Sequence, residues 1–404
     1  AHLKYWFSCK KTRASAGNKD VLIVFLASIG NAVIFLDALK NFGKLYKKED
    51  GYKIYILCNP STYAVFKLNQ FDENYVFLNS ETDEYFMKIK AFKHTLKLVS
   101  KTQWLKTVVF PYGNMIGYIA ANITSNEKLS IDNKDTNCGA RIYHLLDNKA
   151  YTEVIRVEND TMDLVRYATV LRHLGMRDYK AVISEINSDK FDTGFSGEYC
   201  VVDICSRSTA KMWELDKFAE VINYIIEHKK LHICIPGSKT YLHTYGALEP
   251  MITHKEYVHS YIGKTNIKGW IDLIAGAEFV LSNDTASTHI AASCGVKCIC
   301  IAGYWQFGKF LPYTVETEKG NTHVPCAVLD DKDKYKCIGC ENIGCFKGYG
   351  NAECRKRVIE RQTIFKARLA DNLDRETVDF PNPFVLSASC LFLRQHLQML
   401  SYNL

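Results

Sequence analysis

The sequence lacks any apolar run long enough to cross a membrane. Its longest runs, such as residues 21–27 and 279–282, fall well short of the roughly 20 residues that a spanning helix needs. The N-terminus also lacks the charged, apolar and small-residue regions of a secretory signal. We therefore expect a cytoplasmic protein, whose association with a membrane would be peripheral and at the inner face of the inner membrane.

Blocks of like charge are absent as well. The net charge is +7, and the lysines are spread along the chain, which argues against a dedicated nucleic-acid surface. Two explanations of the mild positive excess stay open. It either reflects a solvated lysine-rich surface or suits anionic partners such as a nucleotide sugar or a phosphorylated glycolipid.

Internal repeats of solenoid period and low-complexity segments are missing too, so repeat architectures are excluded. The composition is that of a globular protein, with 47% hydrophobic and 24% charged residues. A single hydrophobic core stops growing near about 250–300 residues, so a chain of 404 residues predicts two domains.

Cysteine, in contrast, is plentiful, with 15 residues. Most lie singly in apolar stretches, where a free thiol behaves as a small hydrophobic group. Members of this group are Cys58, Cys200, Cys234, Cys298 and Cys300. This use of cysteine fits a reducing cytoplasm.

Strand-like and helix-like segments alternate along the chain in two series. Short apolar runs rich in branched residues predict buried parallel strands at 21–26, 53–58, 75–78, 107–110, 199–204, 231–235, 279–281 and 298–301. Apolar residues at helical spacing predict helices between them, among them 32–46, 116–123, 162–174, 215–227, 268–275 and 286–293. A polar stretch with glycines at 188–198 separates the two series. The pattern predicts an α/β protein with two doubly wound Rossmann-like domains, at 1–195 and 196–404.

The most informative stretch is 279–293. A strand there ends in polar residues and turns directly into a helix, with Asp284, Thr285 and Ala286 at the turn and His289 one turn later. Free N–H groups and the positive end of the helix dipole favour a diphosphate at such a position. From spacing alone, a helix-capping role for Asp284 is equally well supported.

Two further predicted strands end in small or charged residues. Strand 199–204 is followed by Ser206 and by Lys211-x-Trp213, and strand 231–235 by Gly237 and Ser238. A lysine just before a helix can neutralise a leaving pyrophosphate, which gains charge as the sugar bond breaks. Taken alone, this element is also compatible with an exposed lysine beside a core tryptophan.

Four cysteines lie in a polar, glycine-rich stretch near the C-terminus, at Cys337, Cys340, Cys345 and Cys354. Their C-x2-C-x4-C-x8-C spacing suits a tetrahedral thiolate site for zinc or iron. The alternative is that they remain free thiols. A closed four-thiolate site leaves no open coordination position, so its role would be structural.

In this order, the elements resemble the glycosyltransferase family that contains the lipopolysaccharide heptosyltransferases, glycosyltransferase family 9. The family's donor signature is Asp-Thr/Ser-Gly, two residues, His and a small-residue helix. Asp284, Thr285 and His289 fall into register with it, and Ala286 stands where glycine is usual. A left-handed backbone at that alanine would be strained. The resemblance extends over residues 20–370 and is strongest from 199 to 304.

The resemblance implies a GT-B fold with the site in a central cleft, and an inverting glycosyltransferase that requires no cofactor for catalysis. It implies transfer of a heptose or a related sugar from an ADP-type donor to lipopolysaccharide core or another cell-surface glycoconjugate. The N-terminal domain would bind the acceptor and the C-terminal domain the donor. The donor-binding residues implied are Ser206, Lys211, Gly237, Ser238, Asp284, Thr285, Ala286 and His289. A sugar-nucleotide epimerase of the same fold and a non-catalytic nucleotide-sugar-binding homologue are the alternatives.

The first strand shows one departure from the family. Heptosyltransferases have Gly-Asp after it, and the resemblance implies that this aspartate is the general base. This chain has Gly30-Asn31, and a neutral amide cannot accept the proton. Three explanations stay open: Asp37 substitutes for it, although it lies roughly 240° around the helix from Asn31; the acceptor needs no strong base; or Asn31 reflects an engineered change or lost activity. Asn31 and Asp37 are therefore the catalytic candidates.

Overall fold

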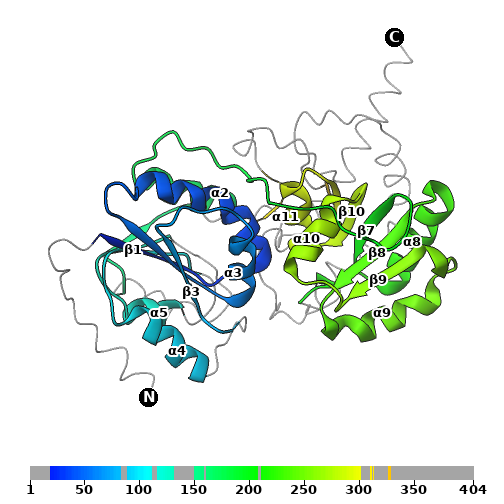
Figure 1. Cartoon of the computed structure of the whole chain (residues 1–404), viewed down its shortest axis with the longest axis horizontal. Coiled ribbons are helices and arrows are strands. Elements are labelled where there is room, and N and C mark those ends of the chain that lie inside the picture. The colour runs from blue at the N-terminus through cyan, green and yellow to red at the C-terminus, as the bar shows by residue number, and fades with distance from the viewer. Residues whose placement is uncertain are drawn as a thin grey trace, which may run out of the picture. The chain divides into compact units, whose positions relative to one another are not determined.

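The computed structural model describes residues 19–82, 89–111, 116–131, 150–158, 161–207, 211–301, 310, 311, 313 and 326–328. The chain divides into two compact units, Ala1–Ser184 and Glu185–Leu404 (Figure 1). Within the described residues, no helix has the length and apolar character needed to cross a membrane.

The first unit is built on a six-stranded sheet in the order β3-β2-β1-β4-β5-β6, in which every neighbouring pair is parallel. Residues 21–25 of the central strand are completely buried, as expected for a parallel strand with helices on both faces. The strands are β1 (Asp20–Phe25), β2 (Lys53–Cys58), β3 (Tyr75–Asn79), β4 (Gln103–Val109), β5 (Thr124–Ile131) and β6 (Glu153–Ile155).

Helices cover both faces of this sheet. On one face α2 packs against α3 and α7 around a cluster of aromatic rings, in which Phe35 lies 4.2 Å from Phe25 and 4.9 Å from Tyr167 between ring centroids. On the other face α4 and α5 contribute side chains to a core with Leu22 and Val24. The helices are α2 (Ile29–Leu45), α3 (Pro60–Lys67), α4 (Ile89–Val99), α5 (Ile116–Ala121) and α7 (Asp163–His173).

The second unit repeats this plan with the order β12-β11-β10-β7-β8-β9, again with parallel pairs throughout. Its strands are β7 (Tyr199–Asp203), β8 (His232–Gly237), β9 (Val258–Ile262), β10 (Phe279–Asn283), β11 (Lys297–Ile301) and β12 (Cys326–Val328). Its α-helices are α8 (Leu215–Lys229), α9 (Leu242–Leu248), α10 (Ile267–Ala275) and α11 (Ala286–Ser293), with short 3-10 turns η2 (Lys239–Tyr241), η3 (Glu249–Met251) and η4 (Lys255–Tyr257).

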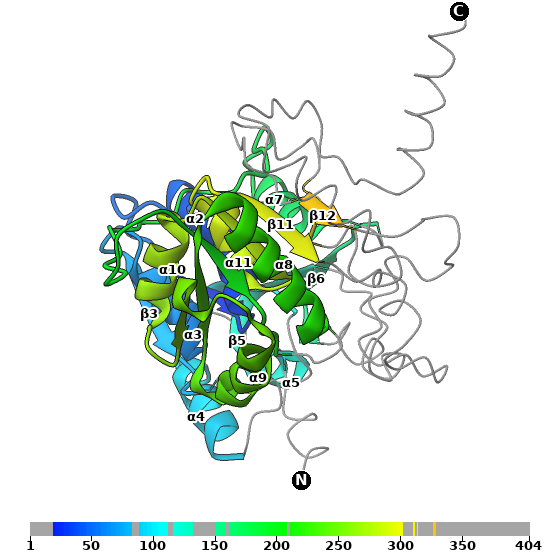
Figure 2. The same ribbon diagram turned by 90° about the vertical axis from the view of Figure 1, so that its right-hand side faces the viewer.

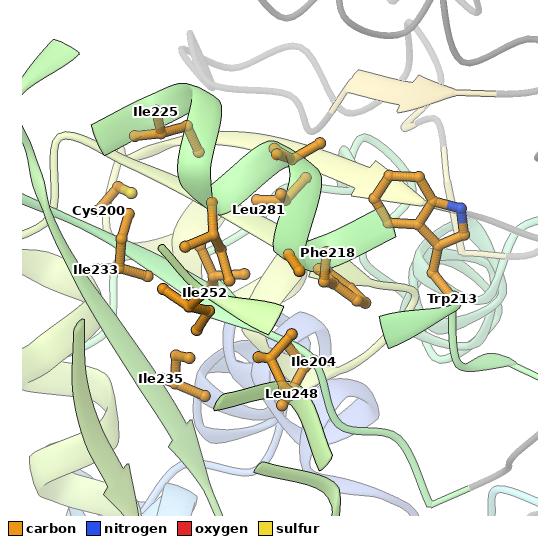
Figure 3. Close-up of a cluster of buried hydrophobic side chains, with 14 of the residues drawn as sticks. Cys200, Ile204, Trp213, Phe218, Ile225, Ile233, Ile235, Leu248, Ile252 and Leu281 are labelled. Atoms are coloured by element: carbon orange, nitrogen blue, oxygen red, sulfur yellow. The ribbon is translucent and has the colours of Figure 1, made fainter. Parts of the chain in front are cut away.

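Helix α8 packs beside α9, and α10 beside α11 (Figures 1 and 2). The α8 face buries an apolar cluster in which Phe218 and Ile225 meet residues of β7, β8 and β10 (Figure 3). Each fully buried side chain of this size stabilises the fold by about 1.5–3 kcal/mol. Cys200 and Cys234 are buried and free, and burial raises the pKa of the Cys234 thiol to about 12. Such thiols stay protonated, in agreement with their expected role as small apolar groups.

In both units the first strand is central, the second and third lie on one side, and the fourth to sixth lie on the other. The expected fold class, two doubly wound Rossmann-like domains, is confirmed. The strand order reverses between β1 and β4 and between β7 and β10. In open α/β sheets, ligands bind beyond the carboxyl ends of the strands at this reversal.

The chain passes from the first unit to the second near Ser184, whereas the sequence pattern places the boundary at 195/196. Lys40 Nζ donates to Ser184 Oγ at 2.9 Å within the first unit. Ile186 N donates to Ser293 O, and Asp189 N to a carboxylate oxygen of Asp272, within the second. These backbone contacts draw a polar segment into the second unit, and no periodicity in the sequence could indicate them.

Candidate functional site

The reversal of strand order in the second unit lies between β7 and β10, which end at Asp203 and Asn283. Helix α11 begins immediately after β10, with Thr285 in an extended conformation at its N-cap. The Thr285 side chain makes no cap hydrogen bond to the helix, so no cap side chain covers the first N–H groups of α11. This helix start therefore offers donors to an anion.

Lys211 and Asp284 form an ion pair at this helix start. The Lys211 Nζ lies 3.1 Å from Asp284 Oδ2 and donates to the Asp284 carbonyl oxygen at 3.3 Å. The two side chains are only 17% and 9% exposed. The N-cap of α11 is Thr285, so Asp284 lies one residue before the cap and pairs with Lys211. The alternative role of Asp284 as the helix cap is therefore wrong.

The Lys-x-Trp element is attached to β10 through Asn283. Trp213 N donates to Asn283 Oδ1 at 2.9 Å. Trp213 is buried and packs edge-on against Phe218, with ring centroids 5.1 Å apart. Because Lys211 lies two residues before this anchored tryptophan, the backbone contact brings its side chain to Asp284.

Asp203, which belongs to none of the sequence motifs, accepts hydrogen bonds from the same helix start. Its Oδ2 accepts from Ser287 Oγ at 2.7 Å and from Thr285 Oγ1 at 3.0 Å, and its Oδ1 accepts from Cys205 N at 3.0 Å. Burial raises the pKa of the Asp203 carboxyl, although the hydrogen bonds from Ser287, Cys205 and Thr285 act in the opposite direction. The sequence signal for Asp203 is that it is a charged residue at the end of the otherwise apolar strand β7.

His289 lies one turn into α11 and is 4% exposed. Its Nδ1 is 2.7 Å from the Tyr313 hydroxyl, which is itself buried. Burial lowers the pKa of the His289 imidazole to about 4, against the opposing effect of the Asp284 carboxylate. The ring is therefore neutral near pH 7, and Lys211 is the cation that faces Asp284.

The remaining donor-site candidates follow the neighbouring strand ends. Ser206 is buried after β7, and Gly237 ends β8. A Cβ at Gly237 would lie 3.2 Å from Cys205 Sγ, so the two strand ends approach closely there. Ser238 follows, with its hydroxyl 2.6 Å from that of Thr240. Since parallel strands end at one edge of the sheet, β7, β8 and β10 bring all these positions to the same edge.

Ala286 is the first residue of α11 and continues it as helix. The non-glycine residues with positive φ in the described chain are Glu81 and Lys230. Ala286 therefore has no left-handed backbone, and the strain considered from the sequence does not arise.

The first unit places Asn31 in the first turn of α2, directly after β1. Asn31 Nδ2 donates to Asp163 Oδ2 at 3.1 Å, and Ser28 Oγ donates to Asn31 Oδ1 at 2.5 Å. Asp37 lies elsewhere: its Oδ2 accepts from the Tyr179 hydroxyl at 2.6 Å and from Asn41 Nδ2 at 3.0 Å. The structure therefore does not bring the two catalytic candidates, Asn31 and Asp37, together.

Comparison with known proteins bears on the second unit most directly. Residues 146–337 match the profile described as "Glycosyltransferase family 9 (heptosyltransferase)", a range that includes the pair Lys211 and Asp284. The chain carries a glycosyltransferase family 9 domain. The resemblance inferred from the sequence is thus confirmed.

A curated relative of this chain is the lipopolysaccharide core heptosyltransferase OpsX of Haemophilus influenzae. The two are 29% identical over 121 residues, which are 30% of this chain and 34% of that protein. The chain thus matches about a third of the length of this relative.

Solved structures share the fold of this chain. A glycosyltransferase family 9 protein from Veillonella parvula has a TM-score of 0.58 and 14% identity, covering 88% of this chain and 100% of that one. E. coli heptosyltransferase WaaC with ADP-2-deoxy-2-fluoro heptose has a TM-score of 0.56 and 16% identity, covering 86% and 99%. The iron-containing dodecameric glycosyltransferase TibC from enterotoxigenic E. coli has a TM-score of 0.51 and 10% identity, covering 88% and 77%. These likenesses confirm the GT-B fold expected for the chain.

The four cysteines Cys337, Cys340, Cys345 and Cys354 lie outside the described residues. Within the part of the chain that the structure describes, no group of three or more His, Cys, Asp and Glu side chains is placed to hold a metal ion.

Proposed function

We propose that this chain is an inverting glycosyltransferase that moves a heptose or a related sugar from an ADP-type donor to a bacterial surface glycan such as lipopolysaccharide core. The observation that carries the proposal is the Lys211–Asp284 pair at the start of α11, beside the strand-order reversal. The family 9 profile over the same residues supports it. The name of OpsX, a lipopolysaccharide core heptosyltransferase, suggests the acceptor class.

In the proposed donor complex, the diphosphate lies against the first N–H groups of α11, next to Thr285 and Ala286. Lys211 is close enough to turn from Asp284 Oδ2, at 3.1 Å, to a phosphate oxygen. As the bond from the anomeric carbon to the diphosphate breaks, its electron pair moves onto the diphosphate. A fixed ammonium group stabilises that charge more than it stabilises the ground state.

Asp284 and the neighbouring strand ends complete the proposed donor site. Asp284 can accept hydrogen bonds only, so it suits sugar hydroxyls rather than phosphate. Neutral His289 fixes the α11 turn through Tyr313. Ser206, Gly237 and Ser238 lie at the adjoining strand ends, where small residues let a nucleotide approach the backbone. The ADP of the solved WaaC complex is the basis for proposing adenine as the base.

We further propose that the chain associates peripherally with an anionic membrane, where a glycolipid acceptor resides. Helix α4 supports this: Lys90, Lys93 and Lys97 are exposed along it, and Ile89 at its start is 73% exposed. Basic side chains beside an apolar one favour an anionic lipid surface. Co-sedimentation with phosphatidylglycerol vesicles should fall when the three lysines become glutamine. If the wild type and the triple glutamine variant sediment equally with the vesicles, the proposed membrane association through α4 is contradicted.

The four cysteines near the C-terminus would hold a structural metal ion. Thiolate donors suit both iron and zinc, and the solved TibC structure is described as iron-containing. Elemental analysis of the purified protein should find about one equivalent of either metal per chain, and Cys340→Ser should lose it. A wild-type protein free of both metals would rule the metal site out.

The transfer proposal is tested by incubating the protein with ADP-heptose and a core-glycan acceptor and following ADP release and product mass. Lys211→Ala should weaken ADP binding roughly tenfold to a hundredfold, since a hydrogen bond to a charged group contributes about 1.5–3 kcal/mol. Lys217→Ala is the matched control, because it removes a lysine–carboxylate pair with Glu220 on α8.

The outcomes separate the candidate functions. Glycosylated acceptor with free ADP supports transfer. An isomerised donor supports an epimerase, and binding without turnover supports a non-catalytic homologue. If Lys211→Ala and Lys217→Ala bind ADP equally well, the donor site is wrongly placed.

A further inference from the structure

A chain of three polar side chains links the surface of the first unit to a buried carboxylate. Ser28, at the N-cap of α2, is exposed, whereas Asn31 is 7% and Asp163 only 2% exposed. Ser28 Oγ donates to Asn31 Oδ1 at 2.5 Å, and Asn31 Nδ2 donates to Asp163 Oδ2 at 3.1 Å. Ser28 and Asn31 belong to the start of α2, whereas Asp163 begins α7, more than a hundred residues later in the sequence.

The Ser28–Asn31–Asp163 hydrogen-bond chain lies where open α/β sheets bind their ligands. Ser28 and Asn31 follow β1 directly, and β1 is the strand beside which the order reverses toward β4. Ligands of open α/β sheets bind beyond the strand ends at that reversal. The second unit has its Lys211–Asp284 pair at the corresponding position of its own sheet.

The buried end of this hydrogen-bond chain, the Asp163 carboxylate, lies among groups that favour its ionised form. A buried carboxylate is strongly unfavourable unless charged and hydrogen-bonding groups surround it. Asp163 Oδ1 lies 3.8 Å from Arg166 Nε, and Asp163 is the first residue of α7, where the helix dipole favours an anion. The amide of Asn31 supplies a further donor. The Arg166 guanidinium, the Asn31 amide and the dipole of α7 all favour the ionised carboxylate.

The outer end of the chain is consequently a strong hydrogen-bond acceptor. Hydrogen bonds in series polarise one another, and the effect is greatest where the medium is apolar. The carboxylate polarises the Asn31 amide, and the polarised amide oxygen accepts the Ser28 proton. With its proton directed at Asn31 Oδ1, Ser28 Oγ accepts from the Asn31 backbone N–H at 3.5 Å and keeps one further lone pair with which to accept a hydroxyl proton from a ligand.

We propose that the Ser28–Asn31–Asp163 chain binds and orients the attacking hydroxyl of the sugar acceptor, with Ser28 in contact with it and Asp163 as a positioning residue. The inference rests on the proposed function. It gives Asn31 a role that an aspartate could not fill beside Asp163. The chain acts by hydrogen bonding, and no proton passes along it.

The test compares acceptor kinetics in five variants, one of them Asn31→Asp alone, with ADP affinity and stability toward urea measured alongside. Ser28→Ala and Asp163→Asn should each lower kcat/KM for the acceptor at least tenfold, with the Kd for ADP unchanged. The exchange variant Asn31→Asp/Asp163→Asn keeps one amide and one carboxylate in contact, so it should recover much of the loss. Ser125→Ala, which removes an exposed serine hydroxyl of β5, is the control.

The exchange variant also keeps the proposal testable if a single variant does not fold. If Asp163→Asn fails to fold, the exchange variant must fold and transfer faster than Asn31→Asp alone. Normal acceptor kinetics in both Ser28→Ala and Asp163→Asn overturn the inference. An exchange variant that folds, binds ADP and shows no recovery overturns it too. Wild-type protein that turns over no donor refutes the proposed function and this inference together, whereas turnover indifferent to Ser28 and Asp163 refutes the inference alone.

Discussion

Acidification should destabilise the second unit through His289. Burial lowers the pKa of this imidazole from 6.5 to about 4. A group whose pKa is depressed by folding contributes stability that is complete above the unfolded-state pKa and is lost as the pH falls toward the folded-state pKa. At about 1.4 kcal/mol per pH unit, the full loss is about 3 kcal/mol, of which about 2 kcal/mol is lost between pH 8 and pH 5.

The assay is urea unfolding of wild type and His289→Asn at pH 8 and pH 5. Asparagine keeps a polar atom near the Tyr313 hydroxyl but does not titrate in this range. The wild type should therefore lose about 2 kcal/mol more than the variant between the two pH values. His243→Asn is the control, since His243 is exposed on α9 and its replacement should leave the wild-type pH dependence in place.

Equal losses in wild type and His289→Asn would refute this reasoning, because they would mean that the imidazole can be protonated in the folded state without cost. The same result would weaken the donor-site description, in which His289 is neutral and Lys211 is the cation facing Asp284.

Three further predictions concern residues at or just after the ends of β7, β8 and β1. Asp203→Ala should lower the free energy of unfolding by about 2–6 kcal/mol, since two buried donors, the Ser287 hydroxyl and Cys205 N–H, each lose their acceptor at about 1–3 kcal/mol; urea unfolding checks this, and a loss below 1 kcal/mol contradicts it. Gly237→Ala should cost about 1–3 kcal/mol, because the new Cβ meets a sulfur at 3.2 Å; an unchanged melting temperature speaks against that close approach. Asn31→Asp places a second carboxylate beside Asp163, which raises the pKa of the pair, so the variant should be less stable than wild type at pH 7 and approach it near pH 4. A penalty independent of pH would argue against an ionised Asp163.

The sequence predicted the α/β alternation because buried parallel strands are continuous apolar runs. The runs at 21–26, 53–58 and 279–281 correspond to β1, β2 and β10 within a residue or two. Strand β5, with the sequence TSNEKLSI, was missed because its polar residues leave no such run. Its place in the sheet depends on pairing with β4, and that contact has no local signature.

The candidate donor site was predictable in part for a similar reason. Lys211, Asp284 and His289 occur in motifs whose residue order marks them as candidates, and the structure brings Lys211 and Asp284 into contact. Asp203 lies in no such motif, and its hydroxyl partners, Thr285 and Ser287, are more than eighty residues away. The Asn31–Asp163 contact likewise joins two helices far apart in sequence. Contacts of this kind depend on the packing of whole elements and cannot be found from spacing.

A crystal structure of the protein with bound ADP tests the central claim most directly. Our account predicts both phosphates at the first turn of α11, with backbone N–H groups near Ala286 as donors and the Lys211 ammonium within hydrogen-bond distance of a phosphate oxygen. A diphosphate bound away from α11, with the Lys211–Asp284 ion pair undisturbed, would contradict it.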